Sequence, residues 1–392
     1  MKTTRGMRLH IGFFGKRNAG KSTIINDITG QEISIVSNTK GTTTDINIKS
    51  MELLPVGPVT LIDTAGLDDV GELGALRIEK TMKALDMSDV IVYVLDNEPL
   101  EKEEKEFILS NKDELILGII NKTDLGLPKK DDFEFLEKYC KKIIYRGENF
   151  TKEFKIALSE ILPDDFFNQG VLISDLVNKN DNVILVIPID KEAPRGRIIL
   201  PQVNTIRELL DNNSIATVCN QNTLKQVLDN LKYPPKLVVT DSQAFFEVNS
   251  IVPNDIPLTS FSILFAKYKG DLKEFYKGSL QLDNLNENDI VLIAESCSHH
   301  PVEDDIGRVK IPNLIKKYTK KDIKFEYYSG HDFPKNLEKY ALIVHCGACM
   351  TNRKEVLNRI NFAKENNTPI TNYGIAIAKC LGILDRAIKP VL

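Results

Sequence analysis

Gly15-Lys16-Arg17-Asn18-Ala19-Gly20-Lys21-Ser22 is the stretch that decides the fold of the first part of this chain. It fits the pattern Gly-x-x-x-x-Gly-Lys-Ser/Thr, with an apolar run before it and a helix-like run after it. Glycines let backbone N–H groups close on phosphate oxygens, and the start of a helix adds a favourable dipole. We expect Lys21 to reach the β- and γ-phosphates of a nucleotide and the Ser22 hydroxyl to bind Mg²⁺. The nucleotide-binding residues predicted here are Gly15, Asn18, Ala19, Gly20, Lys21, Ser22 and Thr23.

Two short motifs further along predict that the nucleotide is GTP. Asp63-Thr64-Ala65-Gly66 closes a β-like run, which places Asp63 near the Mg²⁺ and the Gly66 amide near the γ-phosphate. Asn121-Lys122-Thr123-Asp124 follows another apolar run, and the Asp124 carboxylate can accept two hydrogen bonds that guanine offers and adenine does not. Each motif is weak alone. In this order, and each after a strand, they predict a guanine site that includes Asn121, Lys122 and Asp124.

The composition is that of a globular, core-forming protein. Hydrophobic residues make up 42% and charged residues 27% of 392 residues, enough for two or three domains of roughly 100–200 residues each. The net charge of −4 gives no electrostatic reason to expect nucleic acid or an anionic membrane as a partner. No apolar run approaches the ~20 residues of a membrane-spanning helix, and residues 1–7 lack the features of a secretory signal. We therefore expect a cytoplasmic protein with reduced cysteines.

Cysteine and histidine gather towards the end of the chain, in Cys297-Ser298-His299 and His345-Cys346-Gly347-Ala348-Cys349. With His300, these segments hold three of the six cysteines and three of the five histidines. Both segments follow strand-like runs, and helix-like patterns lie between the runs. Strand–helix–strand order favours a parallel sheet, in which the carboxyl ends of the strands share one edge. We therefore expect Cys297 to lie beside Cys346 and Cys349 despite their separation in sequence.

The cysteine segments predict a metal site. Three thiolates with non-thiolate neighbours suit a [4Fe–4S] cluster with one iron left open, or a structural zinc. The candidate further ligands are His299, His345 and Asp305. The alternative without metal is a group of buried thiols with polar histidines at the strand ends. Cys219 is expected to be a core thiol, and Cys140 and Cys380 are not expected to be ligands.

The middle of the chain, residues 166–260, carries no catalytic pattern. Strand-like runs at 183–188 and 236–240 alternate with amphipathic helix patterns at 204–210 and 222–231. This alternation predicts a small α/β unit with mostly parallel pairing. A region without chemistry between two active regions is a candidate for self-association.

The nucleotide motifs resemble those of the TrmE/Era group of translation-factor-related GTPases. Gly41-Thr42-Thr43-Thr44-Asp45 is similar to the switch I of that group, in which Thr43 would bind Mg²⁺ and sense the γ-phosphate. Asn18 matches the asparagine with which potassium-activated members hold K⁺ beside the phosphates; otherwise it caps its own turn. Leu67 stands where Ras-like enzymes have a water-orienting Gln, so hydrolysis should be slow and should depend on a cation, a dimer partner or a client. The catalytic residues predicted are Lys21, Thr43 and Gly66.

The pattern Cys-x-His followed after about 45 residues by His-Cys-x-x-Cys resembles the signature of the [FeFe]-hydrogenase maturation GTPases of the HydF type. The resemblance extends over the whole chain, from the GTPase motifs to the cysteine-bearing end. It implies that Cys297, Cys346 and Cys349 bind a [4Fe–4S] cluster, while His299 and His345 match the histidines of the family. It also implies a scaffold that holds a binuclear-iron precursor, assembled with two radical-SAM maturases, and delivers it to the apo-[FeFe]-hydrogenase.

The expected fold class is α/β, in three domains that are each a mostly parallel sheet flanked by helices, the first with a P-loop GTPase fold. Residues 1–167 would bind GTP, residues 168–262 would form the dimerisation domain that the resemblance implies, and residues 263–392 would bind the iron–sulfur cluster. The cofactors expected are GTP, Mg²⁺, K⁺ and a [4Fe–4S] cluster. A homodimer is expected, and neither nucleic acid nor membrane is expected as a partner.

Two other functions fit parts of the sequence. A ribosome- or tRNA-associated GTPase with a structural zinc would share the nucleotide motifs, but its relatives carry a basic RNA-binding domain. This chain has no basic excess and no Gly-x-x-Gly loop in a suitable setting. The third possibility is a non-catalytic GTP sensor in which the metal only staples a small domain.

Overall fold

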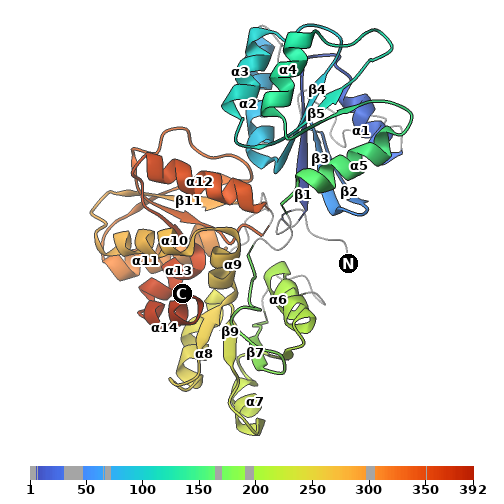
Figure 1. Ribbon diagram of the computed structural model, residues 1–392. Coiled ribbons are helices and arrows are strands. Elements are labelled where there is room, and N and C mark those ends of the chain that lie inside the picture. Colours follow the sequence, from blue (N-terminus) through green and yellow to red (C-terminus); the bar gives the residue numbers. More distant parts are fainter. Residues whose placement is uncertain are drawn as a thin grey trace. The chain divides into compact units, whose positions relative to one another are not determined.

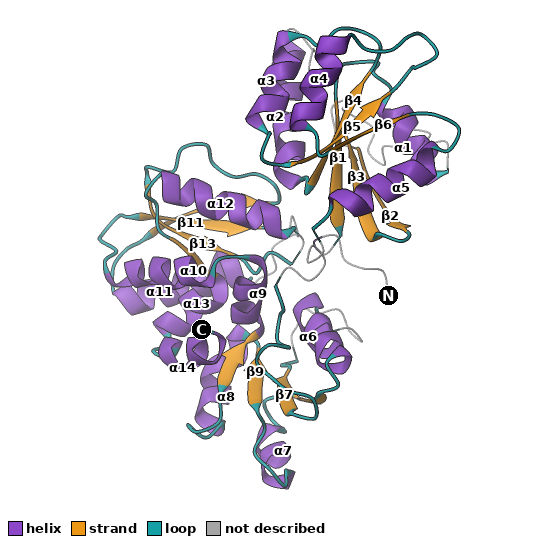
Figure 2. Cartoon of the chain, viewed as in Figure 1, coloured by secondary structure: helices purple, strands orange, loops and turns teal. Residues whose placement is uncertain are grey.

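The structure is a computed structural model that describes residues 6, 8–30, 47–64, 66, 72–163, 170–189, 198–296, 305–349 and 351–392 (Figure 1), with the backbone alone at residues 72–79. The chain divides into two compact units, residues 1–167 and 168–392. In both units helices pack on mostly parallel sheets (Figure 2), which is the α/β class expected from the sequence. None of the helices described here has both the length and the low polarity that crossing a bilayer requires.

A six-stranded sheet forms the centre of the first unit. Its strands are β1 (Leu9–Phe14), β2 (Asn47–Leu53), β3 (Gly57–Asp63), β4 (Val90–Leu95), β5 (Leu115–Ile120) and β6 (Lys142–Tyr145). Their spatial order is β2-β3-β1-β4-β5-β6, and all neighbours are parallel except β2, which runs antiparallel to β3. Strands β1 and β4 are buried along their whole length, because helices cover both faces of the sheet and the strands are almost continuously apolar.

Five helices cover this sheet on two faces. They are α1 (Lys21–Thr29), α2 (Glu72–Met87), α3 (Lys102–Ser110), α4 (Lys130–Tyr139) and α5 (Phe150–Ile161). Side chains of α1 and α5 join one hydrophobic core, and side chains of α2, α3 and α4 join the other. The first unit is therefore a three-layer, doubly wound fold with the carboxyl ends of its parallel strands on one edge.

Two four-stranded parallel sheets form the second unit. The strands are β7 (Asn182–Val186), β8 (Ile215–Cys219), β9 (Leu237–Thr240), β10 (Leu258–Ser260), β11 (Ile290–Glu295), β12 (Lys324–Ser329), β13 (Tyr340–His345) and β14 (Ile370–Asn372). The first sheet has the order β10-β9-β7-β8 and the second β12-β11-β13-β14. All pairs are parallel, which confirms the pairing expected from the alternation of strand and helix patterns.

Helices follow most strands of the second unit. They are α6 (Leu200–Asp211), α7 (Leu224–Asn230), α8 (Phe245–Ile251), α9 (Phe261–Lys269), α10 (Leu272–Ser279), α11 (Ile311–Thr319), α12 (Arg353–Glu365), α13 (Tyr373–Cys380) and α14 (Leu384–Ile388). Four shorter helical turns complete the unit: η3 (Ser242–Ala244), η4 (Leu280–Asp283), the π-helical η5 (Ile306–Lys310) and η6 (Lys389–Val391).

One hydrophobic core continues through both sheets of the second unit. It includes side chains of β7 and β9 from the first sheet and of β11, β13 and β14 from the second. Helix α9 contributes four consecutive buried positions, Ile263 to Ala266, and full burial of each large side chain contributes about 1.5–3 kcal/mol. The predicted boundary between residues 262 and 263 falls within this helix, so the division into three domains stays a prediction.

Candidate nucleotide and metal sites

The loop between β1 and α1 has a backbone that only glycine can follow at two points. Gly15 has φ of 139°, and a Cβ there would lie 2.3 Å from the carbonyl oxygen of Val94. Gly20 has φ of 97°, and its Cβ would lie 2.1 Å from the side-chain nitrogen of Asn121. Both contacts are closer than real Cβ atoms allow. The close neighbours and the positive φ angles together explain why the loop has glycine at these two positions.

Lys21 lies across this loop. Its Nζ donates to the carbonyl oxygens of Gly15 at 3.0 Å and Lys16 at 2.6 Å, and the side chain is buried. The ammonium group is thereby held on the loop itself. This is the place where the P-loop sequence pattern predicts that the lysine contacts phosphate oxygens. Ser22 and Thr23 are exposed at the start of α1.

Ser22, a predicted Mg²⁺ ligand, is in direct contact with Asp63, which is predicted to lie near the Mg²⁺. Strands β1 and β3 are neighbours, with Phe13 opposite Asp63, and the Ser22 hydroxyl donates to Asp63 Oδ2 at 2.7 Å. The other carboxylate oxygen, Oδ1, is buried and has no hydrogen-bond partner among the described residues. Burial raises the pKa of Asp63 despite the opposing effects of Ser22 and Lys21. A buried carboxylate oxygen without a donor, next to a serine hydroxyl, fits a divalent cation.

The remaining switch residues lie largely outside the described part of the chain. Thr43 lies outside it, and Gly66 is described although its neighbours at 65 and 67–71 are not. Asn18 is described: it is exposed on the loop and has φ of 61°, a left-handed conformation. Its role in binding K⁺ stays a prediction.

The base-reading motif is anchored to the phosphate loop. Asn121 follows β5 directly, and its side-chain nitrogen donates to the carbonyl oxygen of Ala19 at 2.7 Å. Lys122 has φ of 54° and its Nζ donates to Asp96 Oδ2 at 3.2 Å. Asp124 is exposed beyond them. The contact between Asn121 and Ala19 joins the two predicted motifs across 102 residues of sequence.

The sequence places Tyr145-Arg146-Gly147 where a base-binding loop is expected, but it does not predict what Arg146 contacts. Arg146 follows β6, where the sequence lacks the Ser-Ala pair usual in base-binding loops. Its guanidinium donates to Asn121 Oδ1 at 3.2 Å and to Asp27 Oδ2 at 2.7 Å. The position after β6 was visible in the sequence, but only the folded chain shows that this arginine supports Asn121.

The strands that precede the two cysteine segments are neighbours in the second sheet of unit two. Strands β11 and β13 are neighbours, with Ala294 opposite His345, and the chain leaves them for opposite sides of the sheet, towards β12 and β14. Such a switch point is where open α/β sheets bind ligands. Cys297 and His299 lie outside the described residues. Ser296, directly before Cys297 in the sequence, contacts Cys346.

Cys346 has hydrogen-bond partners that favour a thiolate. Its Sγ accepts from the N–H of Ser296 at 3.0 Å and from the N–H of Ala348 at 3.4 Å, and it lies 3.3 Å from Ser296 Oγ. Burial opposes the charged form, but the neighbouring His345 imidazole and these donors outweigh it and lower the pKa of Cys346 to about 7. Thiolates are the form that binds metals, so the donor set fits a metal centre.

Three other cysteines behave differently. Burial raises the pKa of Cys140 to about 12, that of Cys380 to about 12 and that of Cys219 to about 11. These thiols stay protonated at neutral pH, as expected of cysteines that pack against hydrophobic cores. Cys349 is partly buried at the end of the same turn as Cys346.

His345 uses both ring nitrogens within the protein. Its Nδ1 lies 2.8 Å from the carbonyl oxygen of Cys346, and its Nε2 lies 3.1 Å from the guanidinium of Arg359. Both ring nitrogens of His345 are therefore already engaged by partners within the protein. To bind a metal, His345 would first have to give up one of these partners.

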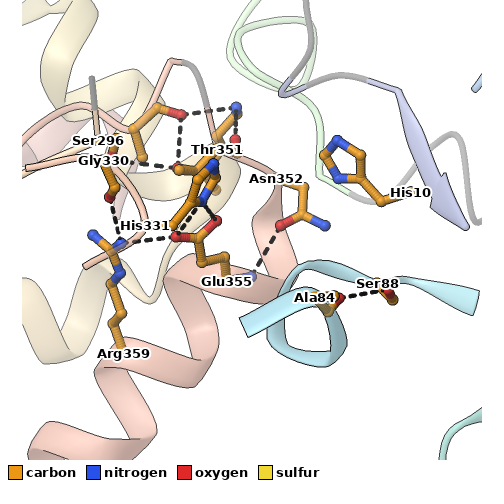
Figure 3. Close-up of polar contacts among 12 residues, drawn as sticks. His10, Ala84, Ser88, Ser296, Gly330, His331, Thr351, Asn352, Glu355 and Arg359 are labelled. Carbon is orange, nitrogen blue, oxygen red and sulfur yellow. Dashed lines mark hydrogen bonds and ion pairs between the residues drawn. The ribbon is translucent and has the colours of Figure 1, made fainter. Parts of the chain in front are cut away.

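Helix α12 fixes the arginine that holds His345. Figure 3 shows Arg359 between the Gly330 carbonyl oxygen, at 2.8 Å, and the Glu355 carboxylate, at 2.7 Å. Glu355 also meets His331 Nδ1 at 3.0 Å. Burial would raise the pKa of Glu355, but the hydrogen bond from His331 and the charge of Arg359 lower it overall, so the carboxylate stays ionised. The network gives His345 a fixed orientation.

Asp305 is buried and caps η5. Its Oδ1 accepts from the N–H of Arg308 at 2.8 Å. Within the described residues no group of three or more His, Cys, Asp and Glu side chains is arranged to hold a metal ion. Of the predicted ligands, Cys346 and Cys349 lie in one described turn, and the assignment of Cys346, Cys349, Asp305 and His345 as ligands stays a prediction.

The fold and these two edges define a P-loop GTPase domain joined to an α/β unit with a cysteine-bearing turn. Residues 10–122 match the model of the 50S ribosome-binding GTPase family, residues 172–270 that of the hydrogen maturase F dimerization domain, and residues 273–390 that of the hydrogen maturase F tetramerization domain. The chain belongs to the hydrogen maturase F (HydF) family. The two hydrogen maturase F models favour self-association.

The curated relatives share the GTPase part. The tRNA modification GTPase MnmE of Helicobacter pylori (strain J99) is 38% identical over 155 residues, which are 38% of this chain and 33% of that protein. MnmE of Caldicellulosiruptor saccharolyticus is 29% identical over 174 residues, 42% of this chain and 37% of that protein. GTPase Der of Borreliella afzelii is 32% identical over 178 residues, 43% of this chain and 40% of that protein. The chain thus spans less than half the length of these three relatives.

Solved structures resemble the chain more distantly. Era of Aquifex aeolicus bound to GDP and AlF₄⁻ is 18% identical, covers 53% of this chain and 91% of its own, and gives a TM-score of 0.33. The G domain of the FeoB iron transporter of T. maritima is 20% identical, covers 39% of this chain and 98% of its own, and gives a TM-score of 0.31. Likeness at this level carries no functional conclusion.

Proposed function

We propose that this chain is a GTP-hydrolysing scaffold for maturation of the binuclear iron centre of [FeFe]-hydrogenase. In this proposal it works in the cytoplasm as a homodimer, receives its cargo from radical-SAM maturases and passes it to the apo-hydrogenase. Membership of the HydF family supports the maturation role, since both matched models of the second unit come from that family. The same matches leave a ribosome- or tRNA-associated role without support in the second unit.

One observation carries the cluster part of the proposal: the hydrogen bond of 3.0 Å from the Ser296 N–H to Cys346 Sγ. Because Cys297 is the next residue in the sequence, this contact supports the proposal that Cys297 and Cys346 bind the same cluster. Cys297, Cys346 and Cys349 would then hold a [4Fe–4S] cluster, which supplies an iron with a vacant position for an exchangeable ligand.

The chain's own residues prepare this edge for metal. Backbone N–H groups of Ser296 and Ala348 stabilise the Cys346 thiolate, which is present in quantity near neutral pH. His299, His345 and Asp305 remain the candidates for the fourth position. Of these, His345 would have to release either Cys346 or Arg359 first, so a weak or exchangeable fourth ligand is the arrangement we favour.

The GTPase part of the proposal assigns roles to residues at the other edge. Lys21 would neutralise the β- and γ-phosphates, while Ser22, Asp63 and Thr43 would hold Mg²⁺ and its water ligands. The Gly66 amide would meet the γ-phosphate. With Leu67 in the position of a water-orienting Gln, K⁺ held at Asn18 would supply the missing positive charge, and hydrolysis would be slow.

Anoxic reconstitution tests the cluster proposal. The metal-free chain is incubated with Fe²⁺ and sulfide, desalted, and measured for bound iron and sulfide and by absorption and EPR spectroscopy. We expect a [4Fe–4S] signal that cyanide perturbs, because an iron with an open position binds a small anion. A chain that keeps stoichiometric zinc and takes up no iron would contradict the scaffold proposal.

The potassium proposal needs a separate experiment. GTP hydrolysis is measured in KCl and in NaCl at equal ionic strength, for the wild-type chain and for Asn18→Ala. We expect faster hydrolysis in KCl and loss of this difference in the variant. Equal rates of the wild-type chain in the two salts would remove K⁺ from the mechanism and leave the GTPase assignment untouched.

A further inference from the structure

Helix α9 ends at a lysine that is withdrawn from water. Lys269 is 2% exposed, and its Nζ donates to the carbonyl oxygens of Ala348 at 2.9 Å and Thr351 at 2.5 Å. These partners lie 79 and 82 residues further along the chain. A buried ammonium group is costly unless hydrogen bonds replace its water, so these two bonds account for a position that lysine rarely occupies.

The backbone that Lys269 holds is the turn that carries the cysteines. Ala348 stands between Cys346 and Cys349 with φ of 53°, a left-handed conformation that costs energy for a residue with a Cβ. Its N–H is one of the donors to Cys346 Sγ, at 3.4 Å. Because Lys269 binds the carbonyl oxygen of the same residue, it opposes relaxation of the turn away from the conformation that aims this N–H at the sulfur.

A second contact joins a side chain of α12 to the backbone at the end of α9. Arg353, the first residue of α12, donates from its guanidinium to the carbonyl oxygens of Tyr268 at 2.6 Å and Gly270 at 3.4 Å. The end of α9 and the segment 348–353 therefore hold each other through side chain to backbone bonds in both directions. Helix α9 lies in the region matched by the dimerization model, whereas the cysteine turn lies in the region matched by the tetramerization model.

We propose that Lys269 is a positioning residue for the turn from Cys346 to Cys349. It keeps Ala348 in its left-handed conformation, and thereby keeps the N–H donor on Cys346 and the two sulfurs in one arrangement. Part of the support of the cysteine turn thus comes from outside its own sheet. The effect of Lys269 on iron binding rests on the proposed cluster function. Its effect on the conformation of the turn is independent of that function.

Hydrogen–deuterium exchange of the metal-free, reduced full chain tests the proposal. In Lys269→Met the amides of residues 346–352 should exchange about tenfold faster or more than in the wild-type chain, because two buried bonds to a charged donor are lost. Lys267→Met is the matched control: Lys267 lies on the same helix, and its ion pair with Asp175 does not involve the turn. It should leave exchange at residues 346–352 unchanged.

If Lys269→Met does not fold, the more conservative variant Lys269→Gln is used for the same measurement. Lys269→Gln retains a polar donor but is too short to keep both bonds, so it should also speed exchange of the turn. Exchange within twofold of wild type in a folded Lys269 variant would overturn the proposal. Faster exchange throughout α9 and β13 together would overturn it as well, since that result marks Lys269 as a general stabilising residue.

Iron release separates this proposal from the cluster proposal. After reconstitution, an iron chelator should strip Lys269→Gln several-fold faster than Lys267→Met. If the wild-type chain forms no cluster but the turn loosens in Lys269→Gln, the positioning role stands and the cluster function fails. If the cluster forms and the turn keeps its protection in that variant, the positioning role fails alone.

Discussion

The nucleotide edge of the first unit, with the phosphate loop, and the cysteine edge of the second unit, with the turn from Cys346 to Cys349, are held in place by different kinds of contact. Both lie at the carboxyl ends of parallel strands, where a loop presents polar groups. In the phosphate loop Lys21 is held by carbonyl oxygens only five and six residues away. In the cysteine turn the Ser296 donor to Cys346 lies 50 residues away and the Lys269 donor to Ala348 lies 79 residues away. The lysine of the phosphate loop is therefore held within its own segment, whereas the cysteine turn is held largely by residues distant in the sequence.

This difference has a physical basis. A nucleotide carries several charges and meets many backbone N–H groups, so a single glycine-rich loop and a helix start supply most of its partners. Thiolates need few partners, but their relative placement has to be fixed, and distant strands and helices supply that constraint. Changes far from the motif should therefore affect the cysteine edge more than the nucleotide edge.

The largest effect should come from Cys346→Ala. It removes a thiolate that no neighbouring group replaces, so bound iron after anoxic reconstitution should fall to background. GTP hydrolysis should stay within the range of the wild-type chain, because Cys346 belongs to the other unit. Cys219→Ser is the control: that thiol packs beside the core of the first sheet of unit two, and its replacement should leave iron content intact. Full iron content in Cys346→Ala would contradict the assignment of iron binding to the cysteine edge.

Gly15→Ala tests the nucleotide edge in the same way. A methyl group would meet the Val94 carbonyl oxygen in a backbone conformation unfavourable for alanine, so GTP affinity should fall by about a hundredfold. Gly30→Ala is the matched control, since Gly30 also has positive φ, of 63°, but has open space around it. Affinities measured with a fluorescent GTP analogue should separate the two variants. Equal affinities of the two variants would show that the close approach of Gly15 to Val94 is not required for GTP binding.

Asp63→Asn should reduce Mg²⁺-dependent GTP hydrolysis by at least about tenfold, because the amide is a weaker ligand for a divalent cation. The nucleotide-free variant should nevertheless unfold at a higher temperature. Since folding raises the pKa of Asp63, the group's stabilising contribution is present below its unfolded pKa and lost as pH rises through the folded pKa. The ionised carboxylate then destabilises the folded chain at neutral pH, and the amide avoids this.

The pH dependence checks that argument. The difference in unfolding temperature between Asp63→Asn and the wild-type chain should shrink when the pH is lowered towards the range in which Asp63 is protonated. Melting curves at several pH values, without nucleotide or Mg²⁺, measure it. A difference that grows on acidification would contradict the raised pKa.

The smallest effect should come from Arg146→Ala. Its ion pair with Asp27 and its bond to Asn121 are partly exposed to solvent, and such contacts contribute about 0–1 kcal/mol. GTP affinity should therefore fall by no more than about fivefold. Asp124→Asn, which would change the proposed direct contact to the guanine base, should lower GTP affinity further. If Arg146→Ala were as damaging as Asp124→Asn, Arg146 would have to be placed in the base site itself.

Several elements could be predicted because their signal is local. The strand pattern before each motif appears as β1, β5, β11 and β13, and their parallel pairing follows from the helices between them. Strand β12, Lys324–Ser329, was not predicted, because charged and aromatic residues at a sheet edge give no clear apolar run. Yet the position of β12 beside β11 is what makes the gap between β11 and β13 a switch point.

Other site residues carry no sequence signal. Lys269 is one lysine among many in the chain, and its burial depends on where α9 docks. Arg359 resembles any charged residue of an amphipathic helix until the fold places it beside His345. Arg146 is the intermediate case, since its place after a predicted strand could be noted but its contact with Asn121 could not.

By itself, the sequence determined the phosphate loop, the strands that precede the motifs, and the residue types gathered at the cysteine edge. Those features depend on residue type and short spacing, which act before the chain is folded. Only the tertiary structure decided that Ser296 meets Cys346, that Arg359 occupies one side of His345, and that Lys269 holds Ala348. Such contacts join segments that are brought together by burial of the shared core, and burial depends on the whole unit rather than on any one stretch.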